Sequence, residues 1–167
     1  MKKITLLSAL FAIFSLSTFA ADGGKKSDDV NKVPYFVLRQ FESEFVDAKE
    51  MTWTVNENFE KVDFMVDQVK MAAYYDTNGK YIGHTEAVTY NNLPTHAKKQ
   101  IAREYEGFHV KELIRFQYAE MPTSPLTRLA ATNVNDDEVY LLTIYKADKE
   151  TTLRISPTSA VEVLSKN

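Results

Sequence analysis

The chain has 167 residues, contains no cysteine and carries a formal net charge of −3 at pH 7. The lack of cysteine excludes thiol catalysis, cysteine-ligated zinc and disulfides, and the acidic balance argues against nucleic acid or an anionic membrane as partner. Ten Phe, nine Tyr and one Trp supply the large apolar areas that a core without disulfides needs. The composition therefore predicts a globular protein that its core alone holds together.

The first 20 residues have the pattern of a secretory signal peptide. Two lysines precede an apolar run over residues 4–19, which is shorter than the ~20 residues that a membrane-spanning helix needs. Small residues at the −3 and −1 positions place the predicted cleavage after Ala20. Residues 21–32 are predicted to be a flexible leader and residues 33–167 a single domain. The mature protein is expected in the periplasm or outside the cell, without a stable membrane span.

A helix is predicted over residues 34–46, followed by a change to the two-residue period of strands. Pro34 suits the first helical turn, and Val37 and Phe41 begin an apolar stripe that a sheet would cover. Alternating apolar and polar residues then predict four strands with short connections, which makes them an antiparallel meander. These strands are predicted at residues 51–55, 62–66, 69–75 and 80–90.

The third and fourth predicted strands are joined by Asp76-Thr77-Asn78-Gly79. Asn-Gly between two aromatic-rich runs is a strong hairpin signal, because both residues tolerate the positive φ that such a turn requires. This hairpin is expected to set the register of the meander.

The second half of the chain repeats the order of a helix followed by strands. Asn92 and Pro94 open a helix that Gly107 ends. Further strands are predicted at residues 110–118, 139–145 and 151–155, with an edge piece at residues 161–164. The predicted fold class is α+β: an antiparallel sheet of about seven or eight strands with two helices packed on one face, in the order helix, four strands, helix, three or more strands.

Several short motifs, taken in order, resemble a known family. They are Ala48-x-x-Met51-x-Trp53, Val62-x-Phe64, Tyr74-Tyr75-Asp76-x-Asn78-Gly79-Lys80-Tyr81-Ile82, Asn92-Leu93-Pro94 and Tyr105-x-Gly107. The combination looks like the PepSY-like proteins exported by Bacteroidetes, whose fold is similar to that of the β-lactamase-inhibitor protein. The turn at residues 147–150 departs from the family's pattern, because it has no glycine. The resemblance implies an exported, non-catalytic protein that binds or inhibits other periplasmic proteins.

The residues themselves predict neither an active site nor a cofactor. His84, His96 and His109 have no metal-ligand spacing, and the Asp76 hairpin lacks the closing glutamate of a calcium loop. No Gly-x-Ser-x-Gly elbow is present. A weak cation candidate is the acidic turn with Asp136, Asp137 and Glu138, for which a solvated turn is the favoured interpretation. We therefore expect no enzymatic activity and no bound metal.

Aromatic side chains on the predicted sheet are the candidate contacts for a partner. Tyrosine supplies rigid contact area with a polar tip, which suits the recognition of a protein or peptide. The candidates are Trp53, Tyr74, Tyr75, Tyr81, Tyr90 and Tyr118, with His84 beside them. Because neighbours in a strand point to opposite faces, the sequence leaves open which of the adjacent pair Tyr74 and Tyr75 faces the helices.

The predicted function is that of a non-catalytic periplasmic binding protein. It would contact a protein or peptide through the open face of the sheet, as an inhibitor or regulator of that partner. The alternative is a module that binds a small ligand or a cation such as calcium.

Overall fold

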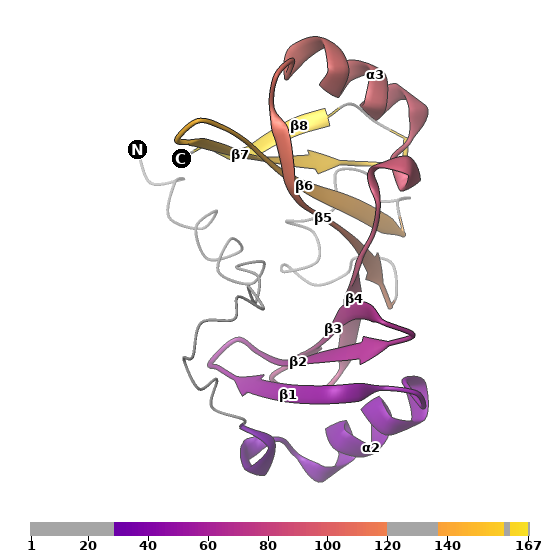
Figure 1. Cartoon of the computed structure of the whole chain (residues 1–167). Helices are drawn as coiled ribbons and strands as arrows, with labels where there is room; N and C mark the ends of the chain where they lie inside the picture. Colours follow the sequence, from indigo (N-terminus) through magenta and orange to yellow (C-terminus); the bar gives the residue numbers. More distant parts are fainter. Residues whose placement is uncertain (1–28, 120–136, 159–160, 167) are drawn as a thin grey trace.

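Eight antiparallel strands form one sheet, in which each strand pairs with its neighbours in the sequence. The computed structural model describes residues 29–119, 137–158 and 161–166, so the predicted signal peptide lies outside the described residues. Figure 1 shows the sheet with its helices. The elements are η1 (Val30–Lys32), α2 (Tyr35–Glu44), β1 (Lys49–Val55), β2 (Phe59–Val66), β3 (Val69–Asp76), β4 (Tyr81–Ala87), η2 (Tyr90–Asn92), α3 (Thr95–Glu104), β5 (His109–Tyr118), β6 (Glu138–Lys146), β7 (Lys149–Ile155) and β8 (Val161–Lys166).

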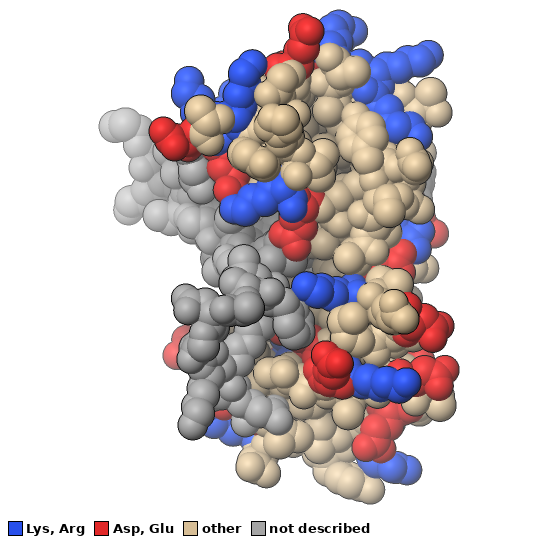
Figure 2. Space-filling view, viewed as in Figure 1, with Lys and Arg blue, Asp and Glu red and all other residues tan. Residues whose placement is uncertain are grey.

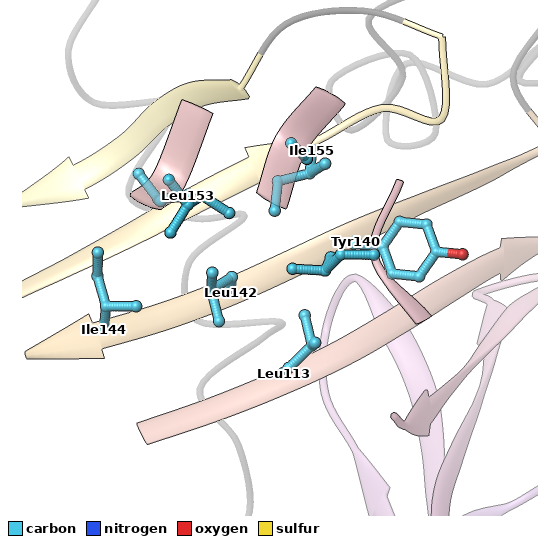
Figure 3. Packing of buried hydrophobic residues seen from close by; sticks show 9 residues of the cluster. Leu113, Tyr140, Leu142, Ile144, Leu153 and Ile155 are labelled. Carbon is cyan, nitrogen blue, oxygen red and sulfur yellow. The ribbon is translucent and has the colours of Figure 1, made fainter. Parts of the chain in front are cut away.

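Both α-helices pack on the same face of the sheet, which we call the helix face. α2 buries Val37 and Phe41 against strands β1 to β3. α3 buries Ala97 and Ile101 against a cluster of sheet residues (Figure 3). In Figure 1 the helices lie at opposite ends of the molecule with the sheet running between them. The predicted fold class and order of elements are confirmed.

The cluster beneath α3 draws its sheet residues from three neighbouring strands. The strand register places Leu113 opposite Leu142, and Leu142 opposite Leu153, so the three side chains share one face. Figure 3 shows them with Tyr140, Ile144 and Ile155. The strand pattern of alternate buried residues therefore continues the helix face across the whole sheet.

The two halves of the fold correspond residue by residue. Up to the first strand after each helix the offset is 60 positions, as for Val33 and Leu93, Pro34 and Pro94, Val37 and Ala97, and Phe41 and Ile101. From β2 and β6 onwards the offset is 80 positions, as for Phe64 and Ile144, and Tyr75 and Ile155. Each half is a 3-10 turn, a helix and four strands. The halves meet where β4 pairs with β5.

Several predicted boundaries differ from the structure, and the cause is visible for two of them. The sequence predicts a flexible leader up to Lys32, whereas residues 29–32 belong to the folded domain, because the Asp29 N–H donates to the Trp53 carbonyl at 3.0 Å. The sequence also predicts a fourth strand up to Tyr90, but β4 ends at Ala87. The chain turns there because the Asn92 side chain accepts hydrogen bonds from the N–H and hydroxyl of Thr89.

The sign of the exposed charges differs between the α3 end and the α2 end of the molecule. The exposed side of α3 carries Lys99 and Arg103, with Lys98 partly buried beside them, and Figure 2 shows basic groups gathered over this end. On α2 both signs alternate, since Arg39 pairs with Glu42 at 2.7 Å. Neither α2 nor α3, nor any other helix in the described ranges, is long and apolar enough to cross a membrane.

Candidate functional site

The predicted contact residues are divided between the two faces of the sheet. The helix face carries Trp53, Tyr75, Tyr81 and His84. The other face, which we call the open face, carries Tyr74 and Tyr118. Tyr90 belongs to neither, because it lies in η2. The structure thus answers the question that the sequence leaves open, because Tyr75 faces the helices and Tyr74 does not. Tyr90 packs at the margin of the α3 core.

Trp53 and Tyr75 are part of the core beneath α2. Both side chains are buried, and the centroid of the Tyr75 ring lies 6.1 Å from that of Trp53 and 5.5 Å from that of Tyr81. Burial raises the pKa of Tyr75 and of Tyr81 far above the usual range, so both remain protonated. With this burial Trp53 and Tyr75 offer no area to a partner, and we assign them to packing.

His84 lies at the margin of the same core. Its Nδ1 is 2.8 Å from the Tyr81 hydroxyl, and its ring packs edge-on against Phe45 at 5.7 Å. Burial lowers the pKa of His84; nearby Arg115 also lowers it, whereas Glu86 opposes the shift. His84 is therefore a neutral, packed imidazole rather than an exposed contact.

The protein is expected to lose stability as the pH falls below about 6.5, because protonation of His84 is harder in the folded state than in the unfolded chain. Between that value and the lower folded-state pKa, the unfolded chain binds more protons, at a cost of at most about 1.4 kcal/mol per pH unit. Chemical denaturation between pH 7.5 and 5.5 measures the slope. His84→Gln should flatten it, while His96→Gln, at an exposed position of α3, should not.

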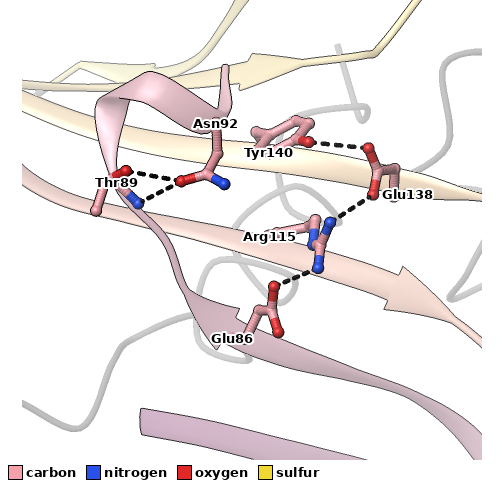
Figure 4. A network of polar contacts seen from close by, with 6 residues as sticks. All are labelled: Glu86, Thr89, Asn92, Arg115, Glu138 and Tyr140. Carbon is pink, nitrogen blue, oxygen red and sulfur yellow. Dashed lines mark hydrogen bonds and ion pairs between the residues drawn. The ribbon is translucent and has the colours of Figure 1, made fainter. Parts of the chain in front are cut away.

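A polar network crosses the middle of the helix face, between the two helices (Figure 4). Arg115 on β5 contacts Glu86 on β4, and its other terminal nitrogen lies 3.3 Å from Glu138 on β6. The Tyr140 hydroxyl donates to the second oxygen of Glu138 at 2.9 Å. The network therefore joins the two halves of the fold at the strands where they meet.

The predicted weak cation site gains no support. Glu138 is engaged by Arg115 and Tyr140, and Asp136 lies outside the described residues. In the hairpin, Asp76 Oδ1 accepts from the backbone N–H groups of Asn78 and Lys80 at 2.8 and 2.9 Å, which stabilises a turn. No group of three or more acidic or histidine side chains in the described part of the chain is arranged to hold a metal ion.

The open face has a buried apolar cluster with a polar depression beside it. Tyr74 and Tyr118 are only 3% and 7% exposed, so these two predicted contacts pack within the cluster, as Trp53 and Tyr75 do beneath α2. Ring contacts in the open-face cluster join Tyr74 to Phe116 at 5.9 Å and Phe116 to Tyr118 at 4.8 Å. The depression lies over strands β2 to β5 and has a cavity volume of about 50 Å³. Its polar lining comprises Lys61, Asp63, Lys70, Tyr74, Thr85 and Glu112.

Two basic and two acidic side chains line this depression: Lys61 and Lys70, and Asp63 and Glu112. Lys61 and Asp63 form an ion pair of 2.8 Å with side chains only 11% and 8% exposed. Glu112 is half-buried; burial raises the pKa of its carboxyl, which Lys111 and Lys70 partly offset. No residue in the described ranges donates a hydrogen bond to that carboxylate, so its lone pairs are available to an incoming donor.

Sequence reasoning missed these charged residues. Lys61 and Asp63 alternate with Val62 and Phe64 along β2, so they share the face of Tyr74. The alternation itself is visible in the sequence, but charges beside an apolar strand normally indicate a solvated face. Only the register across β2 to β5 shows that they meet Glu112 in one depression.

Solved structures with the same fold come from Bacteroides species. A DUF2874 family protein from Bacteroides uniformis matches with a TM-score of 0.62 and 15% identity over 81% of this chain and 88% of that one. A BLIP-like protein from Bacteroides fragilis matches with a TM-score of 0.59 and 15% identity over 84% and 91%. A DUF2874 family protein from Bacteroides ovatus matches with 0.60 and 11% over 80% and 86%.

These likenesses concern the fold. The β-lactamase-inhibitor-like architecture expected from the sequence motifs is confirmed by them. No family model matches the chain, and no curated protein sequence does. The PepSY-like assignment therefore stays a prediction.

Proposed function

We propose that the protein is a non-catalytic periplasmic protein that binds a protein or peptide partner on the open face of its sheet. The observation that carries the proposal is the depression over β2 to β5, where the Glu112 carboxylate is half-buried without a hydrogen-bond donor among the described residues. A partly desolvated carboxylate of this kind accepts a stronger hydrogen bond from an incoming donor than a fully exposed one does. The signal-peptide pattern of the first 20 residues supports export.

The chemistry of the depression fits binding better than catalysis. A partner side chain that donates to Glu112 would lie beside Lys70, above the buried Tyr74 at the floor of the depression. The three histidines lie elsewhere, His84 on the helix face, His96 on α3 and His109 at the start of β5. No imidazole base therefore accompanies the hydroxyl and carboxyl groups of the depression. A role as inhibitor or regulator of that partner is supported by the likeness of the fold to the BLIP-like protein from Bacteroides fragilis.

The open face is tested by reversing the charge of Glu112. Periplasmic extract of the producing bacterium is passed over immobilised mature protein, and retained proteins are quantified by mass spectrometry. We expect a partner that wild type retains and Glu112→Lys loses at least tenfold, because the new lysine repels the partner's donor. The matched control is Glu42→Lys on the outer side of α2. Equal retention by Glu112→Lys, or loss with Glu42→Lys, contradicts the proposal.

A small-ligand role is the second candidate, because the depression has the volume of a few atoms rather than of an extended groove. Thermal denaturation in the presence of amino acids and short peptides distinguishes the two. A single amino acid that raises the midpoint in wild type but not in Glu112→Lys favours the small ligand. Calcium is expected to leave the midpoint unchanged, because Asp76 and Glu138 are already engaged.

A further inference from the structure

We propose that Asp29 and Gln100 close the two outer edges of the sheet and prevent edge pairing with a second copy of this chain. The sheet is open, so β1 and β8 are its edge strands. An edge strand presents backbone N–H and C=O groups that form a template for another strand. In this protein both edges are met by a polar group from outside the sheet.

At the β8 edge the group is the side-chain amide of Gln100 on α3. The Val161 N–H donates to Gln100 Oε1 at 3.2 Å, and Gln100 Nε2 donates to the Val161 carbonyl at 3.4 Å. A primary amide carries the same donor and acceptor as a peptide group. Gln100 therefore satisfies Val161 as a residue of a ninth strand would.

At the β1 edge the group is Asp29, which precedes η1. The Asp29 N–H donates to the Trp53 carbonyl at 3.0 Å, and Asp29 Oδ2 accepts from the Val55 N–H at 3.4 Å. Lys32 holds the other carboxylate oxygen of Asp29 at 2.6 Å and fixes its position. Asp29 thus takes one donor and one acceptor of the edge, as Gln100 does at the other end of the sheet.

The correspondence between the two halves shows that these contacts belong to the edges. Leu113 is the counterpart of Trp53, and its carbonyl accepts from the N–H of Val88, which follows β4. The residue after the preceding strand thus supplies in the interior the N–H that Asp29 supplies at the edge. Gln40, the counterpart of Gln100, donates to Glu44 at 3.0 Å on the exposed side of α2, as Gln100 does to Glu104 at 3.2 Å. The two glutamines differ in that Gln100 also bonds an edge strand. β4, the counterpart of β8, needs no side-chain amide along its outer side, because β5 pairs with it there.

The edge strands carry further features that oppose pairing. β1 has a register shift between Lys49 and Thr52, with Glu50 at a φ of 56°. The pairing of β7 with β8 has another shift, between Thr152 and Leu153. Such irregularities bend an edge away from a second strand. Both edge strands also carry exposed apolar side chains, since Met51 and Val163 are 47% and 45% exposed. An edge that does not pair keeps these side chains from being buried against a second copy.

The test compares Gln100→Ala with Gln40→Ala. Alanine is the best helix former, so neither variant should unfold its helix. We expect Gln100→Ala to self-associate in sedimentation velocity as concentration rises, while wild type and Gln40→Ala stay monomeric. At low concentration, the Val161 amide of Gln100→Ala should exchange with deuterium about fivefold faster than in wild type, as expected for one lost hydrogen bond.

Two outcomes would overturn the proposal. One is a Gln100→Ala protein that stays monomeric at every concentration while its Val161 amide exchanges faster, since the edge is then open without pairing. The other is equal self-association of Gln40→Ala, since that residue does not touch an edge. Neither result depends on the identity of a partner on the open face, so a failure here leaves the binding proposal intact.

Discussion

Replacing Phe41 by alanine is expected to lower the free energy of unfolding by about 3 to 5 kcal/mol. Phe41 is 2% exposed and is the central ring of the core beneath α2. Its ring centroid lies 5.3 Å from that of Phe45, 5.5 Å from that of Trp53 and 5.0 Å from that of Phe64. Its removal leaves a cavity between the helix and three strands, and it also removes edge-to-face ring contacts.

The control for this change is Tyr35→Ala in the same helix. Tyr35 is 74% exposed, so its truncation should change the free energy of unfolding by no more than about 0.5 kcal/mol. Urea denaturation followed by far-ultraviolet circular dichroism measures both variants. A loss of less than 1 kcal/mol for Phe41→Ala would show that α2 contributes little to the stability of the sheet.

Gly83→Ala is expected to cost about 3 kcal/mol or more, for a different reason. Gly83 has a φ of +152°, which L side chains rarely adopt, and an added Cβ would lie 2.3 Å from the Gln117 carbonyl oxygen. The Phe116 ring would be 3.0 Å away. Because the obstacle is backbone of the paired strand, β4 and β5 must separate locally. The change therefore strains the seam between the two halves.

Gly107→Ala provides the matched comparison. Gly107 also has a positive φ, of +77°, but the nearest atom to an added Cβ is the mobile end of Lys146 at 3.0 Å. Its cost should be the backbone strain alone, about 1 to 2 kcal/mol. Thermal unfolding of both variants separates strain from collision. Equal costs would show that β5 yields without penalty beside Gly83.

Much of the fold follows from local sequence signals. The predicted strand over residues 69–75 and the hairpin at Asp76-Thr77-Asn78-Gly79 are confirmed, because period-two alternation and Asn-Gly chemistry act over a few residues. The prolines before α2 and α3 also indicate where the helices begin. The missed contacts of residues 29–32 join segments distant in sequence, for which a charged, glycine-rich stretch gives no signal.

The candidate site was harder to predict than the fold. The sequence shows that Tyr74 and Tyr75 point to opposite faces, but the face that the helices cover depends on how α2 docks. That packing places Trp53 and Tyr75 in the core beneath α2 and Tyr74 in the buried cluster of the other face. The depression around Glu112 arises from the pairing of strands on either side of α3, so no local pattern indicates it.

The correspondence between the halves has an optical consequence. The first half places Phe41, Trp53, Phe64 and Tyr75 at core positions where the second half has Ile101, Leu113, Ile144 and Ile155. Trp53 is the sole tryptophan of the chain. Indole emission therefore reports on one half, whereas far-ultraviolet circular dichroism reports on both. If the shared sheet makes the halves one cooperative unit, the two signals will change together during unfolding.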